Sequence, residues 1–237
     1  MNFSTSTHKI IKEKLSTTAL ILWVGIVIFS LTFLAYFIDS NISPTNQLED
    51  VLFPFYMISF LPITFSYFYQ FIDFENIEIL KKEYLEINEN NLILNFKDII
   101  RYEDITDIQI VIDAYYNQRI NMAYRTPTEQ KSLGVKNYIK IVTSTQSLNF
   151  HFKLENQFHQ NSLEEIILKI VTENKLNNID SKKSIGLIPN RFKNTDIYKS
   201  YVIAQIRSKR INCTEGLLLH GYESDKVAKD LRKKYCG

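Results

Sequence analysis

The sequence is short of glycine and cysteine, and each shortage excludes a class of function. Its six glycines in 237 residues form no phosphate-cradling loop, neither G-x-x-x-x-G-K-[ST] nor G-x-G-x-x-G. The two cysteines, Cys213 and Cys236, are too few for a disulfide framework in a chain of this length. We therefore expect two free thiols in a reducing compartment.

Signatures of catalysis, metal binding and nucleic-acid binding are also missing. His151 and His159 have no carboxylate or cysteine nearby at the spacing of zinc ligands. Cys213 has no evident partner base that would make it a nucleophile. Residues 73–237 carry a net charge of only +3 without a basic stripe, so the sequence offers no electrostatic footprint for nucleic acid. It predicts a protein that is not an enzyme, holds no cofactor or metal, and binds no nucleic acid.

Charged side chains are absent from two long stretches near the N-terminus. The first, 16–38, has 23 residues, which as a helix reach ~34 Å against ~30 Å for the hydrocarbon core of a bilayer. It ends in the bulky residues YFI, where a signal peptide would need small residues for cleavage. The second stretch, 51–72, is rich in aromatic residues, and Pro62 should kink it. We expect two transmembrane helices joined by an external loop, 39–50.

The charges that flank these stretches predict their orientation. The preceding tail, 1–15, carries Lys9, Lys12 and Lys14 against Glu13, whereas the loop 39–50 carries only acids. Because Lys and Arg are enriched on the cytoplasmic side of membrane spans, we expect a multi-pass protein of the inner (cytoplasmic) membrane with both termini in the cytoplasm.

After the second stretch, the pattern changes to the alternation of apolar and polar residues that is typical of antiparallel strands. Residues 84–96 predict two strands around a turn at 89–91, the segment 104–113 predicts another, and 138–154 predict a hairpin with its tip at STQS. One face of such a sheet is expected to stay in water. The side chains expected to face the core are Leu85, Ile87, Leu92, Leu94, Phe96, Ile108, Ile110, Ile112, Leu148, Phe150, Phe152 and Leu154.

An amphipathic helix is expected to follow these strands. Ser162 and Glu165 form an S-x-x-E capping box at its start. The apolar stripe that continues the helix consists of Leu163, Ile166, Ile167, Ile170 and Val171. An antiparallel sheet with exposed edges must curl or be covered, so we expect a curved sheet or partly open barrel that is plugged by this helix.

The stretch IIRYEDITDI, with Ile100, Tyr102, Asp104, Ile105 and Ile108 in the pattern I-x-Y-x-D-I, resembles bacterial pleckstrin-homology-like (PH-like) domains attached to short membrane hairpins. The resemblance covers about 76–176. It implies a seven-stranded β-sandwich or barrel capped by a helix, with a binding or scaffolding role and no catalytic residues. The chain departs from this family at 114–137 and after 176.

The interval 114–137 has two interpretations. It is long for a structureless connection, so it either hides one more strand over YYNQRINMAY (115–124), which we favour, or forms a basic, aromatic loop that contacts anionic headgroups or a protein partner. In the second case, the candidate contact residues are Tyr115, Tyr116, Arg119, Tyr124, Arg125 and Lys131.

The remaining residues, 177–237, predict a polar linker and a small, mainly helical extension. One helix should begin at Asp196, a short apolar piece follows at 216–222, and Ser224 should cap a last helix. The sequence leaves open whether this extension packs on the sheet. Its basic cluster, Arg207, Lys209 and Arg210, fits a solvated helix end.

These patterns predict an α+β protein with a transmembrane hairpin, a PH-like sheet domain and a C-terminal extension. Its predicted function is non-enzymatic, namely to present a binding or scaffolding domain at the cytoplasmic face, with the lipid bilayer and a protein of unknown identity as partners. Two alternatives stay open. One is an immunity protein that protects against a membrane-directed toxin, and the other is an accessory subunit of a transport or secretion assembly.

Overall fold

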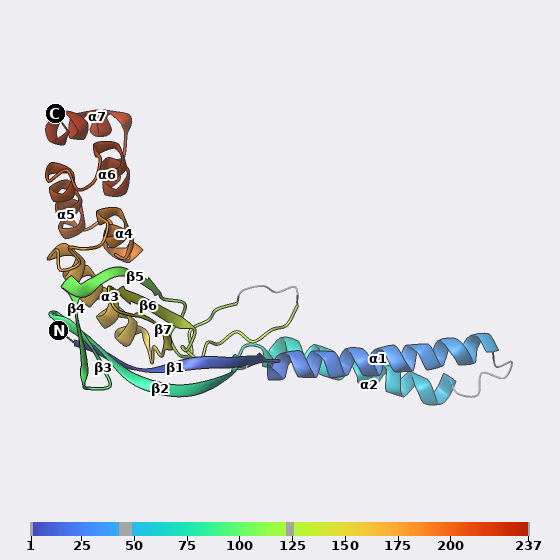
Figure 1. The fold of residues 1–237 in the computed structure, drawn as a ribbon. Coiled ribbons are helices and arrows are strands. Elements are labelled where there is room, and N and C mark those ends of the chain that lie inside the picture. The colour runs from blue at the N-terminus through green and yellow to red at the C-terminus, as the bar shows by residue number, and fades with distance from the viewer. Residues whose placement is uncertain (1, 43–48, 122–125, 237) are drawn as a thin grey trace. The chain divides into compact units, whose positions relative to one another are not determined.

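The computed structural model describes residues 2–42, 49–121 and 126–236 (Figure 1). The chain is α+β, with an apolar helix near the N-terminus and an antiparallel sheet. It divides into two compact units. The first consists of Met1–Lys9, Lys81–Asp113 and Lys136–Gly237, and the second of Ile10–Leu80 and Ala114–Val135.

Seven strands form one sheet in the order β4-β3-β2-β1-β7-β6-β5. The hairpins predicted over 84–96 and 138–154 are confirmed by the pairings Leu85↔Leu94 and Ile139↔Phe150. The strands are β1 (Asn2–Lys14), β2 (Asn76–Asn88), β3 (Asn91–Leu94), β4 (Asp98–Arg101), β5 (Ile105–Val111), β6 (Asn137–Thr143) and β7 (Ser147–Phe152).

Strand β1 lies in the middle of the sheet, between β2 and β7, where the sequence had predicted only a tail over 1–15. Thr7 and His8 pair with Phe152 and His151 of β7. The Thr7 hydroxyl donates to the Glu83 carbonyl of β2 at 3.1 Å. The alternation was overlooked because two of its four buried residues, Thr5 and Thr7, are threonines. Their hydroxyls bond the neighbouring backbone, so they suit a strand interior.

The two edge strands follow one another in the chain, joined only by the 3-10 turn η1 (Tyr102–Asp104). Since three residues connect β4 at one edge to β5 at the other, the sheet must curl until its edges approach. Tyr102 fixes this corner: its buried hydroxyl donates to the carbonyls of Asn88 at 2.6 Å and Asn91 at 3.2 Å. Burial raises the pKa of Tyr102 above its usual value of 10.

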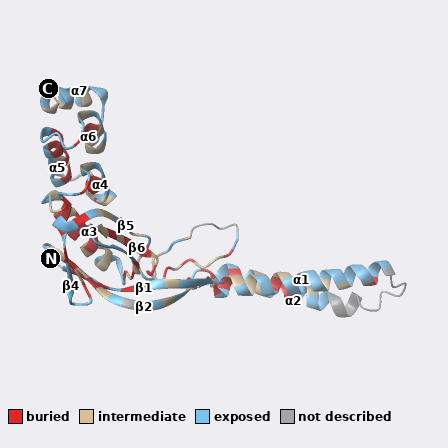
Figure 2. Ribbon diagram, viewed as in Figure 1, coloured by how far each residue is buried: buried red, intermediate tan, exposed pale blue. Residues whose placement is uncertain are grey.

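Helix α3 (Gln157–Thr172) packs on this sheet, and its predicted apolar stripe is confirmed because all five of its residues are buried. Side chains of β2, β3, β5 and α3 line one small internal cavity, and buried residues gather here in Figure 2. The predicted capping box was wrong. The side chain of Asn156 caps the helix by accepting from the His159 N–H, and Ser162 lies within it, donating to the Phe158 carbonyl.

One of the predicted core positions was also wrong. Phe96 is 71% exposed, because it lies in the β3–β4 turn, where its φ of 60° takes it out of strand alternation. Ile112 lies beyond the end of β5 and is half-buried, as are Ile108, Ile110 and Leu148. Most of the other predicted positions, including Leu85, Leu92 and Phe152, are buried.

The C-terminal extension is helical and packs within the first unit. The predicted starts at Asp196 and Ser224 are confirmed, since the side chains of Thr195 and Ser224 cap α5 and α7. In front of α5, an α-helix and a 3-10 turn stand where a linker was predicted. The elements are α4 (Ser181–Gly186), η2 (Asn190–Phe192), α5 (Asp196–Arg207), α6 (Cys213–His220) and α7 (Asp225–Tyr235).

The extension contacts the sheet domain through polar side chains. Lys183 of α4 forms an ion pair with Asp107 of β5 at 3.1 Å, and Arg191 forms one with Glu164 of α3 at 2.5 Å. The expectation of free thiols was wrong. Cys213 and Cys236 form a disulfide that links α6 to the end of α7, with 5.7 Å between their Cα atoms. The helical turns bring together two residues that lie 23 positions apart in the sequence.

The second unit holds two helices, α1 (Thr17–Ile42) and α2 (Glu49–Tyr69), which lie side by side (Figure 1). The Phe29 ring of α1 contacts the rings of Tyr56 and Phe60 of α2 at centroid distances of 5.1 and 5.3 Å. Gly25 lies so close to Ile63 that a Cβ at this position would collide with it. Most side chains described on both helices are exposed (Figure 2). By length and composition, one helix among the described residues, α1 from Thr17 to Asn41, is suited to cross a membrane.

Candidate functional site at the base of the helices

A buried carboxylate links the end of α2 to the start of α1. Asp73 follows α2, and its Oδ2 atom accepts hydrogen bonds from the Thr18 amide at 2.7 Å and the Thr18 hydroxyl at 2.8 Å. Asp73 is 7% exposed and Thr18 is fully buried. The first amides of a helix have no partner within it, and a negative charge there also interacts favourably with the helix dipole. Asp73 thus caps α1 from a distant part of the chain.

A second buried carboxylate, Glu75, positions the loop 114–135. Its Oε2 atom accepts from the Ser132 hydroxyl at 3.0 Å and the Leu133 amide at 3.1 Å. Nearby, the Gln130 side chain donates to the Gln70 side-chain oxygen at 3.2 Å. All of these groups except the Leu133 amide are in buried residues. The residues that follow α2 and the second half of the loop therefore form one polar network.

The loop lies against the same segment through its backbone. The Lys131 amide donates to the Asp73 carbonyl at 3.1 Å, and the Glu75 amide donates to the Lys131 carbonyl at 3.0 Å. The backbone of Lys131 forms two isolated β-bridges, a parallel one with Phe74 and an antiparallel one with Arg119. In the described part of the loop, these isolated bridges replace the extra strand over 115–124 that we had favoured, so that interpretation was wrong. The described part of this segment instead pairs irregularly with the other half of the loop: the Asn117 amide donates to the Ser132 carbonyl at 2.8 Å and the Ile120 amide to the Gln130 carbonyl at 3.0 Å.

Several of the predicted contact residues lie together at this point. The Tyr116 ring stacks on the Phe74 ring at 5.2 Å, and the Lys131 ammonium lies 5.3 Å from the centroid of the Phe74 ring. Arg119 is exposed and stands opposite Lys131 in the antiparallel bridge. Tyr115 is half-buried, and its backbone amide donates to the side-chain oxygen of Gln118 at 3.0 Å. Tyr124 and Arg125 lie outside the described residues.

Two cations lie close together in this cluster. Like charges placed opposite each other in a strand pair destabilise it, so the Arg119–Lys131 pair favours an anionic group beside it. Among the described residues, no three side chains of His, Cys, Asp or Glu are grouped so that they could hold a metal ion. That the protein is not an enzyme stays a prediction.

Sequence reasoning missed the four polar residues that build the site, Gln70, Asp73, Glu75 and Gln130. A signal was present: Gln70 lies near the end of the second apolar run, and Asp73 and Glu75 follow it directly, where a polar group that becomes buried beside apolar residues needs a partner. The sequence did not identify the partners, because Thr18 and Ser132 lie more than fifty residues away. No family model, curated protein or solved structure matches this chain.

Proposed function

We propose that this chain is an integral membrane protein of the bacterial inner membrane, in which α1 and α2 form a two-span hairpin that holds a PH-like binding domain at the membrane surface. In this proposal the protein is not an enzyme, and its partners are the bilayer and a second protein. The observation that carries the proposal is the position of β1.

Strand β1 precedes α1 in the chain, yet it pairs with β7, which follows α2. A strand pair cannot form across a bilayer, so the chain before α1 and the chain after α2 must lie on the same side. If α1 crosses the membrane, the chain has to cross back before β2. The helix between α1 and β2 is α2, whose 21 residues would reach ~31 Å. If α1 spans the membrane, the pairing of β1 with β7 therefore supports α2 as a second span.

The same strand argues against a cleaved signal sequence. Cleavage after α1 would release β1 and remove a central strand from between β2 and β7. It would expose the edges of both strands and deprive the buried Phe152 of β7 of its contact with the Phe3 ring. A retained anchor keeps the sheet complete.

The flanking lysines support a cytoplasmic position for the sheet domain. Lys9, Lys12 and Lys14 precede α1, and Lys81 follows α2 on the same side of the proposed hairpin. The Cys213–Cys236 disulfide favours the second candidate, a domain that faces the cell envelope and protects against a membrane-directed toxin, because disulfides are typical of oxidising compartments.

The binding surface in this proposal is the cluster of Tyr116, Arg119 and Lys131 at the base of the helices. It adjoins α1 and α2 within the same unit, where the headgroup region of a bilayer would lie. Two cations beside aromatic rings suit anionic lipid headgroups. Antiparallel strands followed by α3 agree with the element order expected of a PH-like domain, and the curled sheet supports it.

Single cysteines test the hairpin and its orientation together. In a Cys213→Ser, Cys236→Ser background, Asn41→Cys places a thiol at the exposed end of α1, and Ser144→Cys places one in the exposed β6–β7 turn. A membrane-impermeant maleimide should label Asn41→Cys in intact cells and Ser144→Cys only after permeabilisation. The opposite result would put the domain outside and select the second candidate. Labelling of both from one side would refute the hairpin.

A photo-crosslinking amino acid at position 116 tests the binding surface. We expect adducts with lipid or with a discrete protein in cells. The control position is Asn149, which is exposed on β7, and it should give neither. Equal yields at the two positions would contradict a specific surface at the base of the helices.

A further inference from the structure

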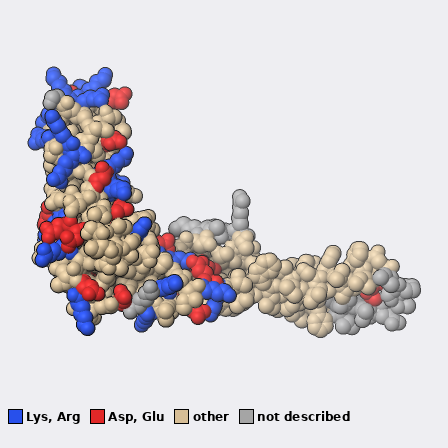
Figure 3. Space-filling view, in the orientation of Figure 1, with Lys and Arg blue, Asp and Glu red and all other residues tan. Residues whose placement is uncertain are grey.

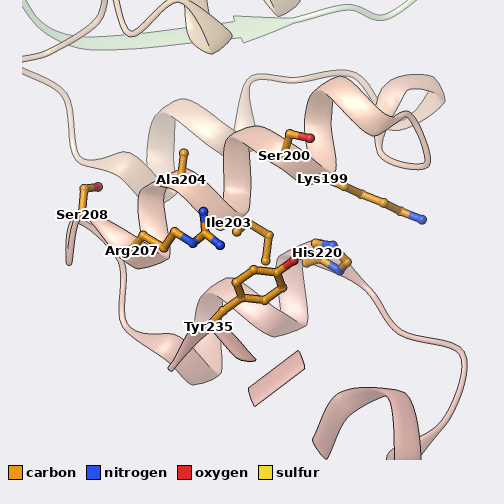
Figure 4. Close-up of a pocket in the computed structure, with 8 residues that line it drawn as sticks. All are labelled: Lys199, Ser200, Ile203, Ala204, Arg207, Ser208, His220 and Tyr235. Atoms are coloured by element: carbon orange, nitrogen blue, oxygen red, sulfur yellow. The ribbon is translucent and has the colours of Figure 1, made fainter. Parts of the chain in front are cut away.

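We infer that the C-terminal helices form a second binding site, for a phosphate monoester group, in a groove between α5, the end of α6 and α7. The groove has a volume of about 580 Å³. Figure 4 shows the side chains along it, and those that carry polar or charged groups are Lys199, Ser200, Arg207, Ser208, His220 and Tyr235.

The chemistry of the groove is that of an anion site. Both of its charged side chains, Lys199 and Arg207, are cationic, and no carboxylate is among the residues that line it. The hydroxyl groups of Ser200 and Tyr235 supply further donors, whereas the Ser208 hydroxyl donates to the Gln205 carbonyl. A guanidinium with neighbouring hydroxyls matches the oxygens of a phosphate, since Arg bonds to phosphate through two parallel N–H groups.

The arginine is held in place before any ligand binds. Its guanidinium carbon lies 4.9 Å from the centre of the Tyr235 ring, and in Figure 4 the guanidinium faces that ring. Tyr235 in turn is fixed by its neighbour Cys236, which is bonded to Cys213 of α6. An Arg side chain restrained in this way loses less freedom when it binds a ligand.

The opposite side of the groove is fixed as well. The hydroxyl of fully buried Tyr198 donates to the Leu219 carbonyl at 3.0 Å, which ties the end of α6 to α5. The next residue, His220, has its Nδ1 atom 2.8 Å from the Gly221 carbonyl. A carbonyl only accepts, so Nδ1 carries a proton and this bond fixes the orientation of the ring.

The surroundings of the groove are also positive. Residues 177–237 hold thirteen Lys and Arg against six Asp and Glu, a net charge of +7, whereas 73–176 carry −4. The near-neutral total had hidden this division. On the face shown in Figure 3, blue side chains gather over α5 and α7. Such a field raises the local concentration of an anion and speeds its association.

Calorimetry on the full-length chain in phosphatidylcholine nanodiscs tests the site, with glycerol 3-phosphate as the soluble probe and glycerol as the uncharged control. At ~150 mM salt, where exposed charges are screened beyond ~8 Å, we expect saturable binding with one phosphate per chain. Arg207→Ala should weaken it about tenfold or more. Arg207→Lys keeps the charge but loses the paired N–H groups, so it should bind with intermediate affinity.

The matched control is the double variant Lys226→Ala, Lys229→Ala, which removes two cations from exposed positions of α7 that do not line the groove. It should change the affinity less than twofold. Circular dichroism and an intact disulfide would show that each variant is folded.

A second arm distinguishes the source of the phosphate. Vesicles of phosphatidylcholine with 20 mol% phosphatidate are compared with pure phosphatidylcholine vesicles in a co-sedimentation assay of the same nanodiscs. Binding to the soluble probe identifies a free phosphomonoester, and Arg207-dependent binding to the phosphatidate vesicles alone identifies a lipid headgroup. The inference is overturned if neither probe binds, or if the α7 double variant weakens binding as much as Arg207→Ala does.

Discussion

Asp73 joins the start of α1 to the end of α2, and its replacement by alanine is the sharpest test of how the helices are attached. The substitution removes two hydrogen bonds that the Asp73 carboxylate accepts from fully buried Thr18, at 2.7 Å from its amide and 2.8 Å from its hydroxyl. A hydrogen bond to a charged group contributes ~1.5–3 kcal/mol, and a charge at a helix N-terminus adds ~0.3–1 kcal/mol. Because no water reaches the Thr18 amide to replace the carboxylate, we expect a loss of about 2–4 kcal/mol in the free energy of unfolding.

The assay is equilibrium unfolding of the full chain in mixed micelles, followed by circular dichroism. Asp73→Asn keeps an oxygen acceptor but removes the charge, so it should cost less than Asp73→Ala. The control is Glu155→Ala, at an exposed position outside the network, which should change the free energy of unfolding by less than ~0.5 kcal/mol.

A double-mutant cycle with Thr18→Val isolates the contact itself. Asp73→Ala and Thr18→Val remove the same hydroxyl–carboxylate bond, so their effects should fall short of additive by at least ~0.5 kcal/mol. Additive effects, or a cost of Asp73→Ala no larger than that of Glu155→Ala, would refute the reasoning.

Three further predictions concern the sheet domain and its extension. Gly216→Ala should lower the free energy of unfolding by ~1–3 kcal/mol, because the new Cβ would overlap Ile206. The control Gly186→Ala meets no atom within 4 Å and should be neutral or slightly stabilising. Equal effects of the two variants in thermal denaturation would contradict this packing. The Lys169 ammonium, followed by the N-terminal amine, lowers the pKa of Glu89 from 4.5 to about 2, so these contacts should stabilise the fold above pH ~4.5 and lose this contribution as the pH falls toward 2. A carboxyl NMR titration should show the low pKa, and Lys169→Gln should raise it part of the way to its ordinary value; an unchanged pKa would rule out the Lys169 ion pair as its main cause. Cys236→Ser opens a covalent loop worth ~3 kcal/mol, and we expect faster hydrogen exchange in α7 than in the parent chain with α5 little changed; unchanged exchange in α7 would show that the disulfide does not hold that helix.

Local pattern was enough to predict much of the sheet domain. Alternation predicted the hairpins of β2–β3 and β6–β7, and the five-residue stripe predicted the buried face of α3, because burial on one side of a strand or helix imposes a period on the sequence. The residue that caps a helix was harder to predict from the local sequence. The N-terminus of α3 was placed several residues late, since Asn156 and Ser162 are both good capping residues and only packing selects between them.

The candidate site was predicted in part. The sequence identified Tyr116, Arg119 and Lys131 from composition, but not the groups that position them. Asp73, Glu75 and Gln70 form hydrogen bonds with partners that lie more than fifty residues away in the sequence. Such pairs leave no local pattern. For the same reason, the pairing of Cys213 with Cys236 was missed: the two lie 23 residues apart, and the fold of α6 and α7 brings them together.

The sequence by itself determined which long segments lack charged residues, which ones alternate as strands, and where α5 and α7 begin, because each of these depends on neighbours within one or two turns. Only the tertiary structure decided that residues 2–14 are a central strand. Their place depends on hydrogen bonds to β2 and β7, whose residues lie about seventy to one hundred and fifty positions away. That single long-range pairing ties the start of the chain to the domain beyond α2, and it is the observation on which our proposal of two membrane crossings depends.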